Sequence, residues 1–371
     1  MGCRGFDEQV VRRDPKVADL LDQFVCVRLV QANAMDLTLF QFDYDLTFAA
    51  FFMNADKTIY GRFGSRSDQK EAARDISLEG FRDALSAALE LHRNYPANRA
   101  ALAGKQGRPV RFNTPDDYPR LRGKYQPKLD YEGKVVQSCM HCHQVGEAER
   151  SWWRSEGKPM PDDVIYPWPM PMAIGLELDP TAKTKVKAVT KQSPAARAGF
   201  KPGDEILSLE GQPLLSIADV QWVLHHAPAP ALLHARVQRG RRQRDLGLAL
   251  PADWRRHSDI SWRATSWDLR RMVTGGLVLK ELPRTERRQA GVADTGLALL
   301  VHYVGEYGEH AAGKRAGFKK DDLLVGVDGQ TKRQTESELI GWLLQSKAVG
   351  ATVPVTVSRA GQRLNLELPI Q

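Results

Sequence analysis

The chain has 371 residues, of which 42% are hydrophobic and 26% charged, a composition typical of a globular protein with two or three domains. Its formal charge of +8 is spread along the sequence. No basic helix with interleaved aromatic residues is visible, so we expect no nucleic-acid binding. No apolar run reaches the ~20 residues of a transmembrane helix, and no signal peptide follows Met1.

Residues 1–95 are predicted to alternate helices and strands. The expected elements are a helix over Val10–Gln23, strands over Phe24–Val30, Leu46–Met53 and Thr58–Phe63, and a helix over Leu78–His92. The second and third strands flank a turn and should form an antiparallel hairpin. Ser77 is the expected N-cap of the last helix. Alternation places Cys26 in the first strand, where we expect it to be buried.

This order of elements resembles the thioredoxin fold, best over the segment DYDLTFAAFFMNADKTIYGRFG. The resemblance implies that Cys3 is a redox thiol, exposed at the start of the first helix. No second cysteine completes a C-x-x-C pair, and Leu46-Thr47 replaces the usual cis-proline. The family's preceding central strand is missing. We therefore expect an N-terminally incomplete thioredoxin-like α/β domain whose true start, with a signal peptide, lies upstream. The alternative for Cys3 is a disordered terminal thiol.

Residues 96–168 form a Pro- and Gly-rich linker that contains the run Cys139-Met140-His141-Cys142-His143. This C-x-x-C-H spacing is the one by which haem c is attached. Cys139 and Cys142 would form thioethers to the porphyrin, and His143 would bind the iron. Haem attachment of this type predicts a periplasmic or other extracytoplasmic location.

Two other interpretations of this run remain open. Zinc or copper could be held by Cys139 and Cys142 with either His141 or His143, or the two cysteines could form a disulfide. If haem is bound, the thioether of Met170 or Met172 is a candidate sixth ligand to the iron.

Residues 169–371 contain an internal repeat. The segment from Ala198 to Gln212 returns 118 residues later as the segment from Ala316 to Gln330. The pattern SPAARAGFKPGDEILSLEGQ closely resembles PDZ domains. The resemblance implies one PDZ domain over residues 169–252 and another over 275–371, with a tryptophan-rich bridge over 253–274. The bridge's rings at Trp254, Trp262 and Trp267 are expected to pack between the modules.

PDZ domains bind the C-termini of peptides or proteins by adding them as a strand to a sheet edge. The expected peptide-binding residues are Ile174, Gly175 and Leu176 in the first repeat, and Gly276 and Leu277 in the second. The matching groove helices are Ile217–His226 and Ser337–Gln345. The alternative is that one or both grooves are blocked and serve only in packing between domains.

The sequence thus predicts an α+β multidomain protein with an incomplete thioredoxin-like domain, a small Cys/His linker and two PDZ domains. No G-x-S-x-G element or other protease catalytic site is visible. We expect an extracytoplasmic redox protein that carries haem c and binds peptide termini. The alternative is a non-enzymatic PDZ adaptor in which the Cys/His run is a structural metal site or a disulfide.

Overall fold

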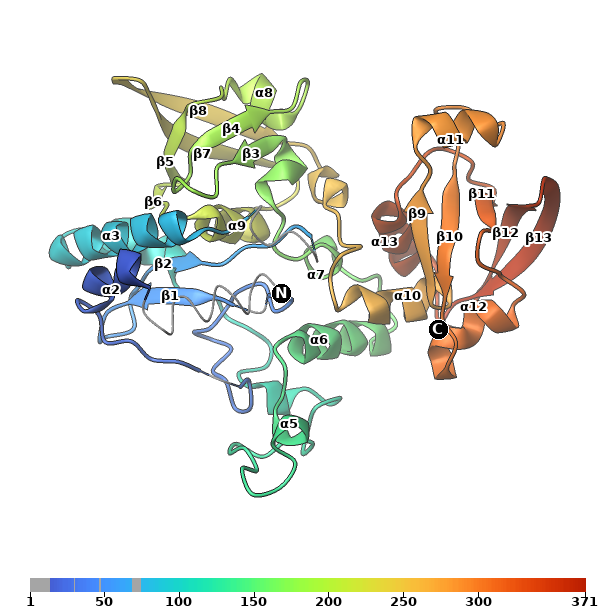
Figure 1. Cartoon of the computed structure of the whole chain (residues 1–371), viewed down its shortest axis with the longest axis horizontal. Coiled ribbons are helices and arrows are strands. Elements are labelled where there is room, and N and C mark those ends of the chain that lie inside the picture. The colour runs from blue at the N-terminus through green and yellow to red at the C-terminus, as the bar shows by residue number, and fades with distance from the viewer. Residues whose placement is uncertain (1–13, 30, 47, 69–74) are drawn as a thin grey trace. The chain divides into compact units, whose positions relative to one another are not determined.

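The computed structural model describes residues 14–29, 31–46, 48–68 and 75–371 (Figure 1). The chain divides into two compact units. The first unit comprises the residues up to 149 together with 166–262, and the second comprises residues 150–165 and 263–371. No helix among the described residues is long and apolar enough to cross a bilayer.

The N-terminal part of the first unit is built on one hairpin and one long helix. Strand β1 (Ala50–Met53) pairs antiparallel with β2 (Ile59–Phe63), and the short helix α2 (Pro15–Leu21) precedes them. Helix α3 (Leu78–Arg93) begins at Ser77, whose hydroxyl accepts the Gly80 N–H as predicted. Apolar side chains of α3 pack on the hairpin, so the predicted hairpin and last helix are confirmed.

The predicted strand over Phe24–Val30 is wrong, because residues 24–29 form no strand. Val25 is 94% exposed, and Cys26 is exposed rather than buried. An alternating apolar pattern becomes a strand only when a neighbouring strand pairs with it and a layer covers it. The described residues of this region offer only the two-stranded β1–β2 sheet. The thioredoxin-like fold is therefore not confirmed, and Cys3 lies outside the described residues.

Short helices make up most of the regular structure between α3 and the first repeat. They are α4 (Arg99–Leu102), η2 (Ala103–Lys105), η3 (Pro115–Asp117), α5 (Val135–Ser138), α6 (His143–Ser155) and α7 (Asp162–Ile165). Helix α6 begins in the first unit and ends in the second.

The first repeat contains two antiparallel sheets and two helices around one apolar core. Its elements are η4 (Pro171–Ile174), β3 (Leu176–Leu178), β4 (Val186–Val189), α8 (Pro194–Ala198), β5 (Glu205–Leu209), β6 (Gln212–Pro213), α9 (Ile217–His226), β7 (Ala231–Arg239), β8 (Arg242–Leu250) and η5 (Trp254–His257). Strand β3 pairs with β4, and the second sheet has the order β6-β5-β7-β8.

The second repeat lies in the second unit and forms a single five-stranded antiparallel sheet of order β13-β12-β11-β10-β9. Figure 1 shows β9 at one edge of this sheet and β13 at the other. Its elements are α10 (Ser266–Thr274), β9 (Leu277–Glu281), α11 (Arg284–Gln289), β10 (Leu299–Val304), η6 (Gly308–Ala311), α12 (Ala312–Arg315), β11 (Leu323–Val327), α13 (Glu336–Ser346), β12 (Thr352–Arg359) and β13 (Gln362–Pro369).

An identical ion pair marks the same place in both repeats. In the first, Arg239 Nε lies 2.7 Å from Asp204 Oδ1, and Arg239 Nη2 donates to the Gly199 carbonyl. In the second, Arg359 Nε lies 2.6 Å from Asp322 Oδ1, and its Nη2 donates to the Gly317 carbonyl. We call this arrangement the Asp–Arg clasp. It confirms in three dimensions that the sequence repeat is a structural repeat.

The tryptophans of the predicted bridge pack inside their own units. Trp254 is completely buried in the core of the first repeat, and the Trp262 ring lies near Arg66 in the first unit. Trp267 lies in the first turn of helix α10 in the second unit, where its ring stacks on His310 with 4.9 Å between centroids. We expected these rings to pack between the modules, but Trp254 and Trp267 each pack within one unit.

Candidate peptide-binding site

The first repeat forms the loop, edge strand and helix that the sequence predicts for a peptide groove. Helix α9 begins at Ser216, whose hydroxyl accepts the Ala218 N–H. Gly175 joins η4 to β3 with a φ of +83°, and a Cβ at this position would collide with the Ser193 side chain. The left-handed backbone and this close approach together explain why glycine occupies the loop.

Strand β3 presents a free edge. Gly175 O accepts the Thr190 N–H and Asp179 N–H donates to Lys185 O, so these alternate residues bond toward β4. The N–H and C=O groups of Leu176 and Leu178 therefore point away from β4. No described contact occupies these outward groups, while both side chains are buried in the core. An extended peptide could pair with this edge.

The groove helix α9 is covered on the side that carries His225 and His226. The Trp168 ring stacks on His225 with 4.4 Å between centroids, and Gln221 Nε2 donates to the Trp168 carbonyl at 2.9 Å. His226 Nδ1 lies 2.8 Å from the Trp222 carbonyl. Burial lowers the pKa of His226 to about 4, so its ring is neutral near pH 7. The segment before the loop thus packs on its own groove helix.

The second repeat has the same glycine loop and edge strand, but the outward backbone groups of that strand differ in their hydrogen bonding. Gly275 and Gly276 take φ values of +62° and +84° and lead into β9. Two of its outward groups are occupied: Thr274 Oγ1 donates to the Leu277 carbonyl at 2.9 Å, and the Leu279 N–H donates to Glu336 Oε1 at 2.7 Å. Sequence reasoning missed Glu336, since its role depends on a contact with a strand far away in the chain.

The Cys/His run lies at the start of α6. Cys139 and Cys142 are both partly buried and unpaired, and burial raises the pKa of the Cys142 thiol. The rings of His141 and His143 stack at 5.6 Å, and burial lowers the pKa of His143. Among the described residues, no three His, Cys, Asp or Glu side chains gather in a group able to hold a metal ion.

The two methionines considered as sixth ligands belong to the segment before the first loop. Met170 packs against the core of the first repeat, and Met172 is 38% exposed. No described contact links either side chain to the Cys/His run, so the structure does not bring these predicted ligands together.

Comparison with known proteins identifies the first repeat. The family model described as PDZ domain matches residues 185–239. A curated relative, the probable periplasmic serine endoprotease DegP-like of Marinomonas sp. (strain MWYL1), is 25% identical over 190 residues, which are 51% of this chain and 38% of that protein. This chain thus spans less than half the length of that relative.

Two solved structures are also similar to parts of the chain. The HtrA3 PDZ domain bound to a phage-derived ligand (FGRWV) is 25% identical over 20% of this chain and 81% of that chain, with a TM-score of 0.18. The HtrA-type protease AlgW with decapeptide is 18% identical over 34% of this chain and 36% of that chain, with a TM-score of 0.23.

The expected function, an extracytoplasmic redox protein with haem c at Cys139, Cys142 and His143, is contradicted by these comparisons. The curated relative is a serine endoprotease and not a redox protein. A short C-x-x-C-H run carries little information by itself, whereas the PDZ match extends over residues 185–239. The chain contains a PDZ domain, and its architecture is mixed α+β with several domains.

Proposed function

We propose that this chain recognises the C-termini of peptides or proteins through the first repeat, as the peptide-binding part of a proteolytic system of the HtrA or DegP type. The observation that carries the proposal is the free edge of β3. Its outward backbone groups at Leu176 and Leu178 are unoccupied among the described contacts, next to a glycine loop and a capped helix. The PDZ match to residues 185–239 supports the same conclusion.

The chemistry of recognition follows from the edge. A peptide running antiparallel to β3 would exchange main-chain hydrogen bonds with Leu176 and Leu178, which gives affinity without regard to sequence. Its terminal carboxylate would lie at the loop formed by Ile174 and Gly175. The Gly175 N–H already donates to the Met172 carbonyl, so the donor at the end of this loop is the outward N–H of Leu176. A charge-assisted hydrogen bond to a carboxylate is about twice as strong as a neutral one.

The second repeat shares the Asp–Arg clasp and the order of strands and helices. We propose that it is a second PDZ module over residues 275–371, derived from the same ancestor by duplication. We also propose an extracytoplasmic location for the chain, since its curated relative is described as periplasmic.

The test uses the full chain and fluorescently labelled short peptides that end in each of the common apolar residues. Each peptide is made with a free C-terminal carboxylate and with a C-terminal amide. We expect saturable binding of a subset of the free acids and a loss of about tenfold or more on amidation, which corresponds to ~1.4 kcal/mol. Equal affinity of acids and amides, or no binding by any peptide, would contradict the proposal.

Proteolysis by this chain is a second candidate, favoured by the DegP-like relative. The sequence shows no G-x-S-x-G element, so a nucleophilic serine would have to be found experimentally. Incubation of the full chain with a fluorophosphonate probe tests this directly. Covalent labelling of one serine, together with degradation of unfolded casein, would support proteolysis. The absence of both would leave peptide recognition as the function.

A further inference from the structure

We propose that the peptide site of the second repeat is closed by the chain itself: helix α10 occupies it, and Glu336 latches it. This inference rests on the proposed function only in taking β9 and α13 as the walls of a peptide groove. It assigns peptide binding to the first repeat alone and gives the second a regulatory or structural role.

Helix α10 packs against both walls at once. It lies directly before the glycine loop and contacts both β9 and α13, which also contact each other. Its apolar side chains Leu269, Met272 and Val273 are at most 1% exposed. A helix that packs on both walls competes for the space that an added peptide strand needs, because backbones must approach to within about 5 Å for strand pairing.

The hydrogen-bonding edge of β9 is also partly occupied. Gly276 O accepts the Gly305 N–H and Leu282 N–H donates to Ala298 O, so alternate residues of this segment bond toward β10. The outward groups are those of Leu277 and Leu279. The Thr274 hydroxyl and the Glu336 carboxylate occupy two of them, the Leu277 carbonyl and the Leu279 N–H. A peptide strand would have to displace both contacts before it could pair.

Arg270 holds Glu336 in this position. Its Nε donates to Glu336 Oε1 at 2.9 Å and its Nη2 to Oε2 at 2.6 Å, in a two-pronged ion pair. The two side chains are only 7% and 4% exposed. Opening the groove would separate this buried ion pair, which is strongly unfavourable. The one carboxylate thus links α10, α13 and β9.

The first repeat lacks every part of this latch. Its groove helix begins after Ser216 as α13 begins after Thr335, so Ile217 stands where the second repeat has Glu336. Aligning the loop glycines Gly175 and Gly276 places Ala173 at the position of Thr274 and Pro169 at that of Arg270. None of these three side chains can form the corresponding hydrogen bonds. The latch belongs to the second repeat alone.

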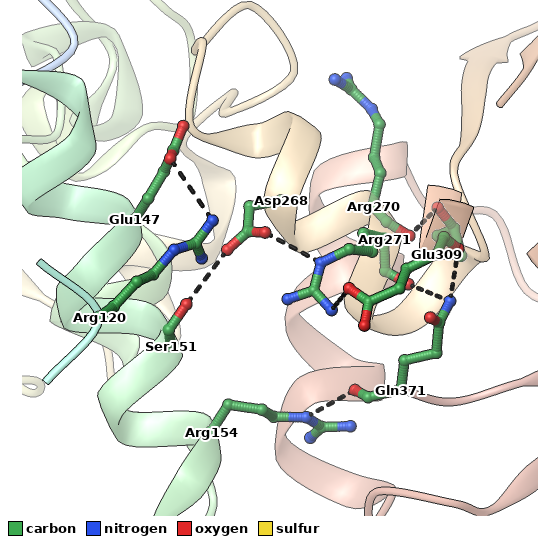
Figure 2. Close-up of polar contacts among 10 residues, drawn as sticks. Arg120, Glu147, Ser151, Arg154, Asp268, Arg270, Arg271, Glu309 and Gln371 are labelled. Atoms are coloured by element: carbon green, nitrogen blue, oxygen red, sulfur yellow. Dashed lines mark hydrogen bonds and ion pairs between the residues drawn. The ribbon is translucent and has the colours of Figure 1, made fainter. Parts of the chain in front are cut away.

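Further contacts of α10 fix its position. Figure 2 shows Arg271 between Asp268 and Glu309, with its Nη1 at 2.8 Å from Glu309 Oε2. The Gln371 N–H donates to the Met272 carbonyl at 2.8 Å, and Arg154 Nε donates to the Gln371 carbonyl at 3.0 Å. The helix is therefore tied to the C-terminal residue as well as to the groove.

The first test measures amide hydrogen exchange in the full chain without any peptide. In the wild type we expect slow exchange at Leu279. Glu336→Ala removes the acceptor and should speed exchange in residues 277–281 by about tenfold or more, since local opening then costs ~1.4 kcal/mol less. The matched control is Glu309→Ala, which removes a 70% exposed partner of α10 without touching the β9 edge. Unchanged exchange in Glu336→Ala would overturn the proposal.

The second test begins with the wild type. A photoreactive peptide with a free C-terminus, chosen as a binder of the full chain, is titrated and its cross-links are mapped by mass spectrometry. We expect one peptide per chain, with cross-links near β3 and none in residues 277–281. The double variant Arg270→Met with Glu336→Ala should gain a second peptide there. Cross-links at β9 in the wild type would overturn closure. Failure of every peptide to bind would contradict the proposed function, and the exchange measurement would still decide closure.

Discussion

Lys105 and Asp219 form an ion pair of 2.9 Å in which both side chains are only 1% exposed. This pair joins the N-terminal part of the first unit to the groove helix α9. Asp219 also accepts the N–H groups of Arg62 at 3.2 Å and Leu215 at 2.9 Å. A single carboxylate therefore compensates a buried cation and organises two backbone segments beside the candidate site.

Replacement of Asp219 by Asn should destabilise the first unit strongly. Lys105 would remain buried without a counter-charge, and removing one partner of a buried pair costs about 3–5 kcal/mol. Urea unfolding, monitored by tryptophan fluorescence, measures the change in the free energy of unfolding. The control is Asp245→Asn, which removes an ion pair with Arg236 whose side chains are 77% and 56% exposed. That change should cost less than about 1 kcal/mol. Equal effects of the two substitutions would contradict the assignment.

The parts of the fold that the sequence predicted correctly are those with local signals. Helices α9 and α13 begin after Ser216 and Thr335, which are hydroxyl caps that can be identified in the sequence. The repeat could be predicted because its glycine and aspartate positions recur with fixed spacing. The clasp between Asp322 and Arg359 was not predicted, since it joins a turn to a distant strand.

The errors share one physical cause. The stretch from Phe24 to Leu29 alternates like a strand, but a strand exists only with a hydrogen-bonding neighbour, and the pattern does not reveal whether one is present. The Glu336 latch could not be predicted either, because its arginine lies 66 residues earlier, in a segment assigned to a bridge.

The His226 ring should make the first unit less stable as the pH falls. Burial, with a smaller contribution from Arg108, Arg62 and Arg255, lowers its pKa from 6.5 to about 4, against the opposing hydrogen bond to the Trp222 carbonyl. Between these two pH values the unfolded chain binds a proton that the folded chain does not, so stability declines as pH falls through this window. The full loss attributable to this ring is of order 3 kcal/mol.

The measurement for His226 compares urea unfolding at neutral pH with unfolding midway between 6.5 and 4. His226→Gln can still donate to the Trp222 carbonyl but does not titrate, so its stability should vary less with pH than that of the wild type. His234→Gln serves as the control, since His234 is exposed on β7. If His226→Gln and the wild type lose the same stability, the ring is not the titrating group.

The Asp–Arg clasp should stabilise both repeats. Asp204 and Asp322 are completely buried and each accepts hydrogen bonds from its arginine and from a lysine N–H. Hydrogen bonds to a charged group contribute about 1.5–3 kcal/mol each, so Asp204→Asn and Asp322→Asn should lower the free energy of unfolding of their own units by at least that amount. Differential scanning calorimetry should show a lowered transition in each variant. An unchanged calorimetric trace for both would contradict the role of the clasp.

Acid should weaken the clasp of the first repeat. Burial alone would raise the pKa of Asp204, but the hydrogen bonds from Arg239 and from the Lys201 N–H bring it below 3.8. The contribution of this carboxylate is therefore complete above pH 3.8 and is lost as the pH falls through the lowered value. The free energy of unfolding, measured with urea, should fall less steeply with decreasing pH in Asp204→Asn than in the wild type. An equal loss of stability with decreasing pH in the variant and the wild type would show that the pKa of Asp204 does not change on folding.

Substitution of Gly175 by Ala tests the candidate loop. The residue has a φ of +83°, and its Cβ would collide with the Ser193 side chain, so the loop must move and the first residues of β3 with it. Gly240→Ala is the matched control, because Gly240 has a φ of +58° in the turn between β7 and β8 with nothing within 4 Å of a Cβ. Both changes carry the cost of a left-handed alanine, about 1 kcal/mol. Only the first should weaken binding of a free-acid peptide, by about tenfold or more.

The comparison of the Gly175 and Gly240 variants needs a check of folding and a measurement of peptide affinity. Circular dichroism and thermal unfolding first establish that Gly175→Ala is folded. If it is not, Gly175→Ala combined with Ser193→Gly removes the colliding side chain and should recover the fold. Fluorescence anisotropy then compares peptide affinities of the wild type, the Gly240→Ala control and the folded Gly175 variant. Because the loop would hold the terminal carboxylate, the variant should lose affinity for the free acid while its weak affinity for the amide is unchanged. An equal loss for acid and amide would place the carboxylate elsewhere.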